Sequence, residues 1–194
     1  MDIKARIHAR KVTLIYFYEI LFFEYMRSNT HVFDDADKVE KLLNRSPLVS
    51  AEHLPPKTTN PETLSSMMRD MSSPYTPEQF DDNVAYIIRN HFDNIPPENI
   101  DIAYIQAVGA TFDLYAPQVE EKVNEYATSF TYKQMDLMDR AIFVLWYAEW
   151  KELGTPKEVV LNEMIELAKR YGDESSAKLI NGIGHKILQA TSDK

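Results

Sequence analysis

The chain has 194 residues, with 30 acidic side chains, 21 basic side chains and no cysteine. This length is typical of one domain, or of one domain with an insertion, and it allows a sizeable core. The lack of cysteine excludes disulfides, thiolate nucleophiles and metal sites with cysteine ligands. The net charge of −9 argues against a protein that coats nucleic acid non-specifically, but it leaves room for a small basic patch.

The first apolar segment predicts a long helix over residues 7–26. Leu14, Tyr18, Leu21 and Tyr25 recur at helical spacing, and further apolar residues between them widen the apolar surface almost to a full circle. A helix of this kind is expected to be central to its fold. The segment is too short for a membrane span and has Glu19 inside it, so we predict a cytoplasmic protein without a membrane segment.

Residues 28–75 have a different character. Five prolines fall here, with clusters of serine, threonine and asparagine between them, and only residues 37–44 and 61–71 have the spacing of short helices. A loop of this length is unusual in a compact domain. We therefore predict one domain over residues 1–194, with residues 28–75 as an insertion or mobile appendage. Its methionines, Met67, Met68 and Met71, suit either a partner site or a small satellite core.

The rest of the chain has strong helix signals and no alternating strand pattern. The expected helices cover residues 76–91, 98–126, 133–153, 155–172 and 173–188, with a kink or division of the second at Pro117, stops at Gly154 and Gly172, and a cap at Asp173. The expected count is about seven helices. The predicted fold class is all-α.

Basic side chains gather at the N-terminus of this acidic chain. The group is Lys4, Arg6, His8, Arg10 and Lys11, and Asp2 is the single acid among them. RNA binding needs positive charge at the phosphates and groups that stack on or bond to bases. The same pattern also fits an ordinary solvated helix start, and the residues alone favour that simpler interpretation.

No catalytic or metal-binding pattern stands out. His31 with its neighbouring aspartates, and His91 with Asp93, have suitable residue types but not the spacing of a known site. No glycine-rich phosphate loop follows a strand. Trp146 and Trp150 suit a core or an interface better than a ligand cage. We predict that the protein is not an enzyme and that it needs neither a metal nor a cofactor.

The C-terminal third carries a specific sequence pattern. Residues 139–142, Glu149, the run NEMIELAKRYGDE at 162–174 and the run KLING at 178–182 together resemble the C-terminal half of the NusB family. The resemblance is strongest over residues 139–188. A weaker one covers residues 7–26, where Ala9-Arg10 and Tyr18 fit the family pattern, and residues 101–126. Residues 28–75 have no family counterpart that we can place.

The resemblance implies a fold of two small helical bundles and a non-enzymatic function. NusB proteins pair with the ribosomal protein NusE, and the pair binds the boxA element of nascent RNA. NusA and NusG belong to the same assembly. The resemblance therefore implies transcription antitermination in support of ribosomal RNA synthesis.

Family positions extend the candidate site residues. For RNA, Tyr18, Lys178 and Asn181 join the basic N-terminal group. For the protein partner, Asp139, Arg140 and Glu149 match the family motif, and Glu120 and Glu121 lie on the helix before it. A basic ribosomal protein would be attracted to an acidic face. The simpler alternative for each is a solvated or locally satisfied side chain.

Four departures from the family pattern keep other functions open. The N-terminal basic residues are spaced more thinly than the arginine run of typical members. Leu179 replaces a phenylalanine that would stack on a base, Val144 replaces an arginine, and Lys11 stands where an acid is common. One alternative is a NusB-like protein-interaction module with weak or lost RNA binding. A homodimer that covers the RNA surface is a related possibility. The accessory domain of a ribosomal RNA methyltransferase ranks last.

Overall fold

A computed structural model describes residues 2–28 and 79–192. The chain divides into two compact units, residues 1–21 with 80–194 and residues 22–79, and the first unit contains the candidate site. All but the first residue of the predicted insertion lies outside the described residues, and so do its two short helices and its methionines. Thr76, the expected cap of the following helix, lies outside them too.

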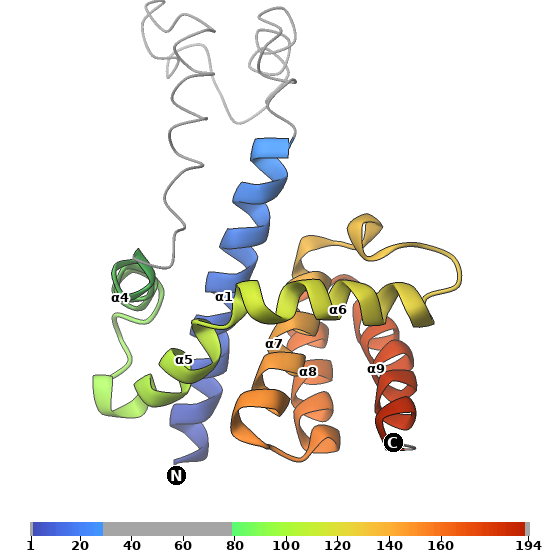
Figure 1. Cartoon of the computed structure of the whole chain (residues 1–194). Coiled ribbons are helices and arrows are strands. Elements are labelled where there is room, and N and C mark those ends of the chain that lie inside the picture. The colour runs from blue at the N-terminus through green and yellow to red at the C-terminus, as the bar shows by residue number, and fades with distance from the viewer. Residues whose placement is uncertain (1, 29–78, 193–194) are drawn as a thin grey trace, which may run out of the picture. The chain divides into compact units, whose positions relative to one another are not determined.

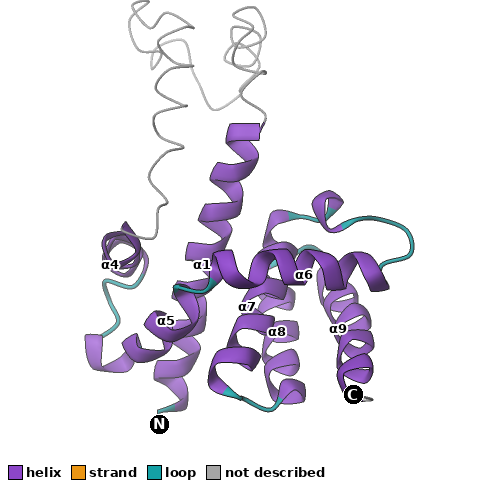
Figure 2. Cartoon of the chain, in the orientation of Figure 1, coloured by secondary structure: helices purple, strands orange, loops and turns teal. Residues whose placement is uncertain are grey.

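Helices form all the regular structure of the described segments, as predicted (Figures 1 and 2). In chain order they are α1 (Ile3–Ser28), α4 (Phe80–His91), the short 3₁₀ helix η3 (Pro97–Asn99), α5 (Ile102–Gly109), α6 (Phe112–Tyr126), the short 3₁₀ helix η4 (Tyr132–Gln134), α7 (Leu137–Leu153), α8 (Lys157–Tyr171) and α9 (Ser176–Ser192). None of the described helices contains a stretch long and apolar enough to cross a membrane.

The first helix begins earlier than the apolar pattern predicts. The carboxylate of Asp2 accepts a hydrogen bond from the Lys4 backbone N–H at 2.9 Å, and the Asp2 carbonyl accepts one from the Arg6 N–H at 3.2 Å. Asp2 thus caps the helix and places a negative charge at its N-terminus. The basic residues therefore lie within α1, where helical geometry decides which way each one points.

The centre of the first unit is α7. Nine consecutive residues of this helix, from Ala141 to Glu149, are buried. The helix packs against α5, α6 and α8, and α9 covers α8 on its other side (Figure 1). Trp146 lies in the core, and its indole N–H donates to the Lys157 carbonyl at 3.4 Å. The first helix, which was expected to be central, also buries Ala9, Val12 and Phe17, but α7 has the longest run of buried residues among the described helices.

The single helix predicted over residues 98–126 is wrong, because the chain turns between α5 and α6. Thr111 ends α5 by donating its hydroxyl to the Val108 carbonyl at 2.6 Å. Gly109 stands at this turn, where a Cβ would lie 2.8 Å from the Phe80 ring, so the approach of α4 requires a glycine. Pro117 lies inside α6 and does not divide it.

Other helix ends follow their local signals. Gly154 ends α7 with a left-handed φ of 59°, and the Asp173 carboxylate caps α9 by accepting from the backbone N–H groups of Ser175 and Ser176. The predicted start of α7 at Lys133 is wrong. Asp136 caps the helix by accepting from the Met138 N–H at 2.8 Å, and Lys133 belongs to η4 instead.

Candidate functional site

The basic residues of α1 point to two different sides of the helix. Arg6 and Arg10 are four residues apart and share the side that faces the interior of the fold, where both form ion pairs. Lys4 and Lys11 are seven residues apart and lie on another side, which Tyr18 also shares by its spacing. The predicted basic patch is therefore divided.

Arg10 is buried, and its guanidinium is used within the chain. Its Nε and Nη2 donate to the two carboxylate oxygens of Glu149 at 2.8 and 2.7 Å, and its Nη1 donates to Glu163 at 2.9 Å. The Tyr104 hydroxyl also donates to Glu149, at 2.7 Å. This network joins four helices, because its members come from α1, α5, α7 and α8.

Electrostatics favour the ionised form of this network. Burial opposes the charge on Arg10, but the hydrogen bond and attraction of Glu149 outweigh that cost and raise the pKa of Arg10. The pKa of Tyr104 is raised well above its ordinary value by burial and by Glu149, so its hydroxyl stays protonated and can donate. The expected roles of Arg10 on an RNA surface and of Glu149 on a partner surface do not fit this placement, because the fold encloses both side chains.

Arg6 and His8 join α1 to the segment before α5. Arg6 Nε donates to Asp101 at 3.0 Å, and its guanidinium lies over the Tyr104 ring at 4.6 Å from the centroid. Asp101 also caps α5 by accepting from the Tyr104 N–H at 3.0 Å. The His8 Nδ1 lies 2.9 Å from the Asn99 carbonyl oxygen. Both predicted RNA-binding side chains thus have structural partners.

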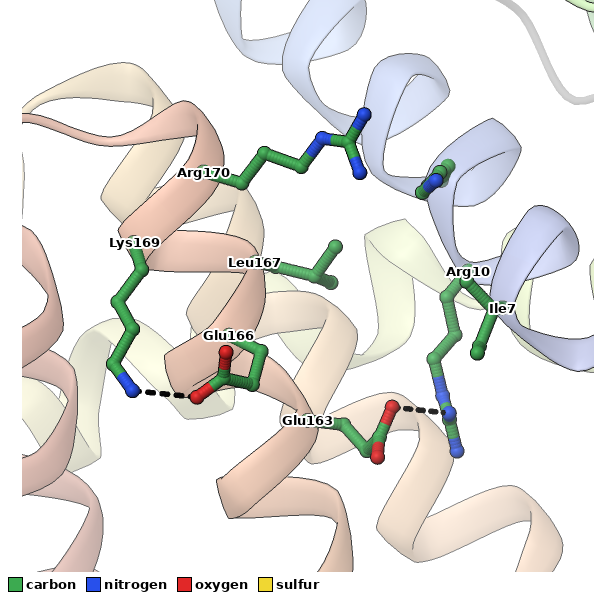
Figure 3. Close-up of a pocket in the computed structure, with 8 residues that line it drawn as sticks. Ile7, Arg10, Glu163, Glu166, Leu167, Lys169 and Arg170 are labelled. Carbon is green, nitrogen blue, oxygen red and sulfur yellow. Dashed lines mark hydrogen bonds and ion pairs between the residues drawn. The ribbon is translucent and has the colours of Figure 1, made fainter. Parts of the chain in front are cut away.

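A charged cleft lies between α1 and α8, with a volume of about 440 Å³ (Figure 3). It is lined by Ile7, Arg10, Lys11, Glu163, Glu166, Leu167, Lys169 and Arg170. Arg10 points to Glu163, and Lys169 binds Glu166 at 2.5 Å, whereas the Arg170 side chain extends from α8 towards α1. Lys11 and Arg170 form no ion pair with any described residue.

The other predicted RNA-binding residues lie on α9. Lys178 and Asn181 are exposed and one helical turn apart. Lys178 lines a second cavity of about 340 Å³ between the end of α6 and α9, with Tyr126, Phe130, Leu179 and Lys186 among its other residues. The cavity combines cationic side chains with aromatic rings, a combination that suits single-stranded nucleic acid.

The predicted protein-partner residues are also divided by the fold. Asp139 is buried. Burial raises the pKa of its carboxyl, and a hydrogen bond from Ser176 offsets only part of this increase. Its Oδ1 has no hydrogen-bond partner. Asp139 is thus not part of an open acidic face, and neither is the enclosed Glu149. Glu120, Glu121 and Arg140 retain accessible surface.

Two of these accessible residues have neighbours of their own. Glu120 lies 3.4 Å from the Lys133 ammonium, and the Arg140 guanidinium lies over the Tyr132 ring at 4.7 Å from its centroid.

In the described ranges, no group of three or more histidine, aspartate or glutamate side chains is placed to hold a metal ion.

Sequence reasoning missed the α8 wall of the cleft. Glu163, Leu167 and Arg170 are spaced four and three residues apart, which places them on one face of a helix. That spacing was visible in the sequence. The information it lacked was which helix this face meets, and therefore that Lys11 and Arg170 line the same cleft.

Comparisons with known proteins agree with the sequence pattern. The model of the NusB family matches residues 61–189, which is more than half of the chain. The chain belongs to the NusB family. The match contains the two C-terminal runs quoted above, and it begins inside the predicted insertion at residue 61. It does not extend to α1.

Several curated relatives are named transcription antitermination protein NusB. The one from Pseudothermotoga lettingae is 35% identical over 75 residues, which is 38% of this chain and 54% of that protein. The one from Synechocystis is 32% identical over 76 residues, or 39% of this chain and 34% of that protein. The one from Clostridium botulinum strain Kyoto is 29% identical over 98 residues, or 50% of this chain and 68% of that protein.

The chain thus spans between a third and about half of the length of the first two relatives. No solved structure matches the chain.

Proposed function

We propose that this NusB-family chain is a non-catalytic transcription antitermination factor that binds a boxA-like RNA together with NusE. Family membership and the names of the curated relatives support the process. Such a factor acts by holding RNA and protein in one assembly, so its requirements are a surface for each and no reacting groups.

One structural observation carries the RNA part of the proposal. Lys4, Lys11 and Tyr18 share one side of α1, and Lys11 also lines the basic cleft with Arg170. Two cations and an aromatic ring at helical spacing give phosphate attraction and base stacking along one stripe. On α9, the exposed Lys178 and Asn181 add a cation and an amide that can bond to a base edge.

The protein part rests on the accessible members of the predicted partner set. Glu120 and Glu121 offer negative charge to a basic ribosomal protein, and Arg140 remains a candidate from the family pattern. NusA and NusG would join the larger assembly. The buried Glu149 supports this surface from inside, because its bonds to Arg10 and Tyr104 fix α1 and α5 against α7.

The test is a binding titration with the full chain. Fluorescence anisotropy of a labelled boxA-like RNA is followed with this protein alone and with NusE, against a scrambled RNA of equal length, at several salt concentrations. We expect sequence-selective binding that tightens when NusE is present. Equal affinity for both RNAs, with no effect of NusE, would contradict the proposal.

A second candidate is a NusB-like interaction module with weak or lost RNA binding. The internal ion pairs of Arg6 and Arg10 favour it, because they remove two of the predicted cations from any RNA surface. Sedimentation of the protein with NusE, with RNA and alone separates the two candidates. Complex formation with NusE but not with RNA would support the module, and self-association alone would support a homodimer.

A further inference from the structure

The cleft between α1 and α8 has an unbalanced set of charges. Four cations line it, namely Arg10, Lys11, Lys169 and Arg170, against the two carboxylates of Glu163 and Glu166. Both carboxylates are already used, since Glu163 accepts from Arg10 at 2.9 Å and Glu166 accepts from Lys169 at 2.5 Å. The positive charge that is left belongs to Lys11 and Arg170.

These two side chains approach the cleft from opposite walls. Lys11 is half-buried on α1, and the Arg170 side chain extends from α8 towards α1 (Figure 3). Burial, followed by repulsion from Arg170, lowers the pKa of Lys11. Two like charges that face each other in a partly desolvated cleft cost free energy in the unliganded protein. An anion between them would convert this repulsion into two attractions.

We propose that the cleft binds one phosphate group between Lys11 and Arg170. The inference rests on the proposed function, in which the phosphate belongs to the backbone of the bound RNA. A free phosphate is the other source of the same chemistry.

The two side chains suit a phosphate in complementary ways. The planar guanidinium of Arg170 can donate two parallel hydrogen bonds to two phosphate oxygens, and the Lys11 ammonium adds a compact charge from the other wall. Glu163 and Glu166 precede Arg170 on α8, and their negative charges would repel a second phosphate. The cleft therefore accepts one phosphate, and an RNA strand would pass over its opening.

The position of Tyr18 fits such a path. It shares the outer side of α1 with Lys11, two helical turns further along. A strand held at Lys11 by one phosphate would bring a neighbouring base to the Tyr18 ring. This relation makes the cleft an anchoring point and leaves sequence selectivity to other residues.

The experiment measures RNA binding by four forms of the full chain: the natural chain, Lys11→Gln, Arg170→Gln and the double variant. Anisotropy titrations use the labelled boxA-like RNA at several salt concentrations. Lys133→Gln and Arg89→Gln remove the same charges from exposed positions outside the cleft and serve as matched controls.

We expect each cleft variant to bind RNA about tenfold more weakly. The slope of log affinity against log salt should fall by about 0.7, the value for one phosphate contact of a single strand. Because both side chains hold the same phosphate, the double variant should be little weaker than either single one. The controls should change affinity less than about twofold. If the natural chain binds RNA and the cleft variants bind it as tightly as the controls do, the inference about the cleft is overturned but the proposed function is not.

A second measurement distinguishes free phosphate from RNA phosphate as the ligand. It also distinguishes failure of the cleft proposal from failure of the proposed function. Thermal unfolding of the full chain is followed in inorganic phosphate and in chloride of equal ionic strength. Stabilisation by phosphate that is lost in the double variant supports the site even if the chain does not bind RNA, and it identifies free phosphate as a ligand. Loss of RNA affinity in the variants without this stabilisation identifies the RNA backbone. A natural chain that responds to neither ligand overturns both proposals.

Urea unfolding of the variants excludes a purely structural role. Because Lys11 and Arg170 repel each other in the free protein, their replacement should leave the unfolding midpoint unchanged or raise it. A lower midpoint for both single variants would show that the side chains support the fold, which would overturn the inference.

Discussion

Glu149, in the middle of the enclosed helix α7, receives two hydrogen bonds from the Arg10 guanidinium of α1, at 2.8 and 2.7 Å. A bidentate pair of this kind is short, directional and charge-assisted. The Tyr104 hydroxyl from α5 donates to the same carboxylate at 2.7 Å. The carboxylate thus fixes two helices against α7, and it sets the rotation of α1 that turns Lys4 and Lys11 outwards.

We expect Glu149→Ala to be strongly destabilising, by about 3–5 kcal/mol, because it leaves a buried guanidinium and a buried hydroxyl without their partner. Urea unfolding followed by circular dichroism measures the change in the free energy of unfolding. Glu166→Ala is the matched control, since Glu166 pairs with Lys169 on the exposed surface. Its effect should stay within about 0.5 kcal/mol. Equal losses for the two variants would show that the network contributes no more than a surface pair.

The helical class and most helix ends were predictable because their causes are local. Gly154 ends α7 and Asp173 caps α9, and each is adjacent in sequence to the helix that it ends or begins. The break between α5 and α6 was not predictable in this way. The chain turns at Ala110 and Thr111, and beside this turn the missing side chain of Gly109 leaves room for the ring of Phe80 from a different helix. Pro117 was the stronger local signal and proved compatible with the helix.

The candidate site was less predictable than the fold for the same reason. The sequence indicated a basic helix start, but it did not say that Asp101 and Glu149 would bind Arg6 and Arg10. Those contacts join residues far apart in the chain. Conversely, Arg170 was absent from the predicted site, because Lys11, which lines the same cleft, lies far from it in the sequence. Only the packing of α1 on α8 brings the two to one cleft.

Replacement of Tyr18 tests whether the outer side of α1 stacks on a base. We expect Tyr18→Ala to weaken RNA binding by about 1–3 kcal/mol without changing the salt slope, because stacking involves no phosphate charge. Tyr18→Phe retains the ring and should bind nearly as well as the natural chain. Anisotropy titrations at several salt concentrations give both quantities.

Tyr86→Ala removes an exposed ring from α4 and controls for general loss of aromatic surface. Equal weakening by the Ala and Phe variants of Tyr18 would contradict stacking and would point to its hydroxyl instead.

The buried carboxyl of Asp139 predicts a pH-dependent effect. Burial raises its pKa in the folded chain, so the folded state binds the proton more tightly than the unfolded state does. The charged form therefore destabilises the fold fully above the folded pKa, and this penalty disappears as the pH falls below the unfolded value of about 3.9. Asp139→Asn should raise the urea midpoint at pH 7 relative to the natural chain, and the gain should shrink towards pH 4.

Asp93→Asn is the control for this measurement, because Asp93 is exposed in the loop after α4. The urea midpoint of Asp93→Asn, relative to the natural chain, should not show a gain at pH 7 that shrinks towards pH 4. A midpoint for Asp139→Asn that is lower at pH 7 would mean that the ionised carboxylate stabilises the start of α7.

Two glycines of α9 predict opposite effects of the same substitution. A Cβ at Gly184 would lie 2.5 Å from a methyl carbon of the buried Leu161, whereas one at Gly182 would meet nothing within 4 Å. We expect Gly184→Ala to cost about 1–3 kcal/mol through overpacking between α8 and α9. Gly182→Ala should gain up to about 1 kcal/mol, since alanine favours the helix. Urea unfolding compares the two, and a gain for both would show that α9 can move away from α8 at little cost.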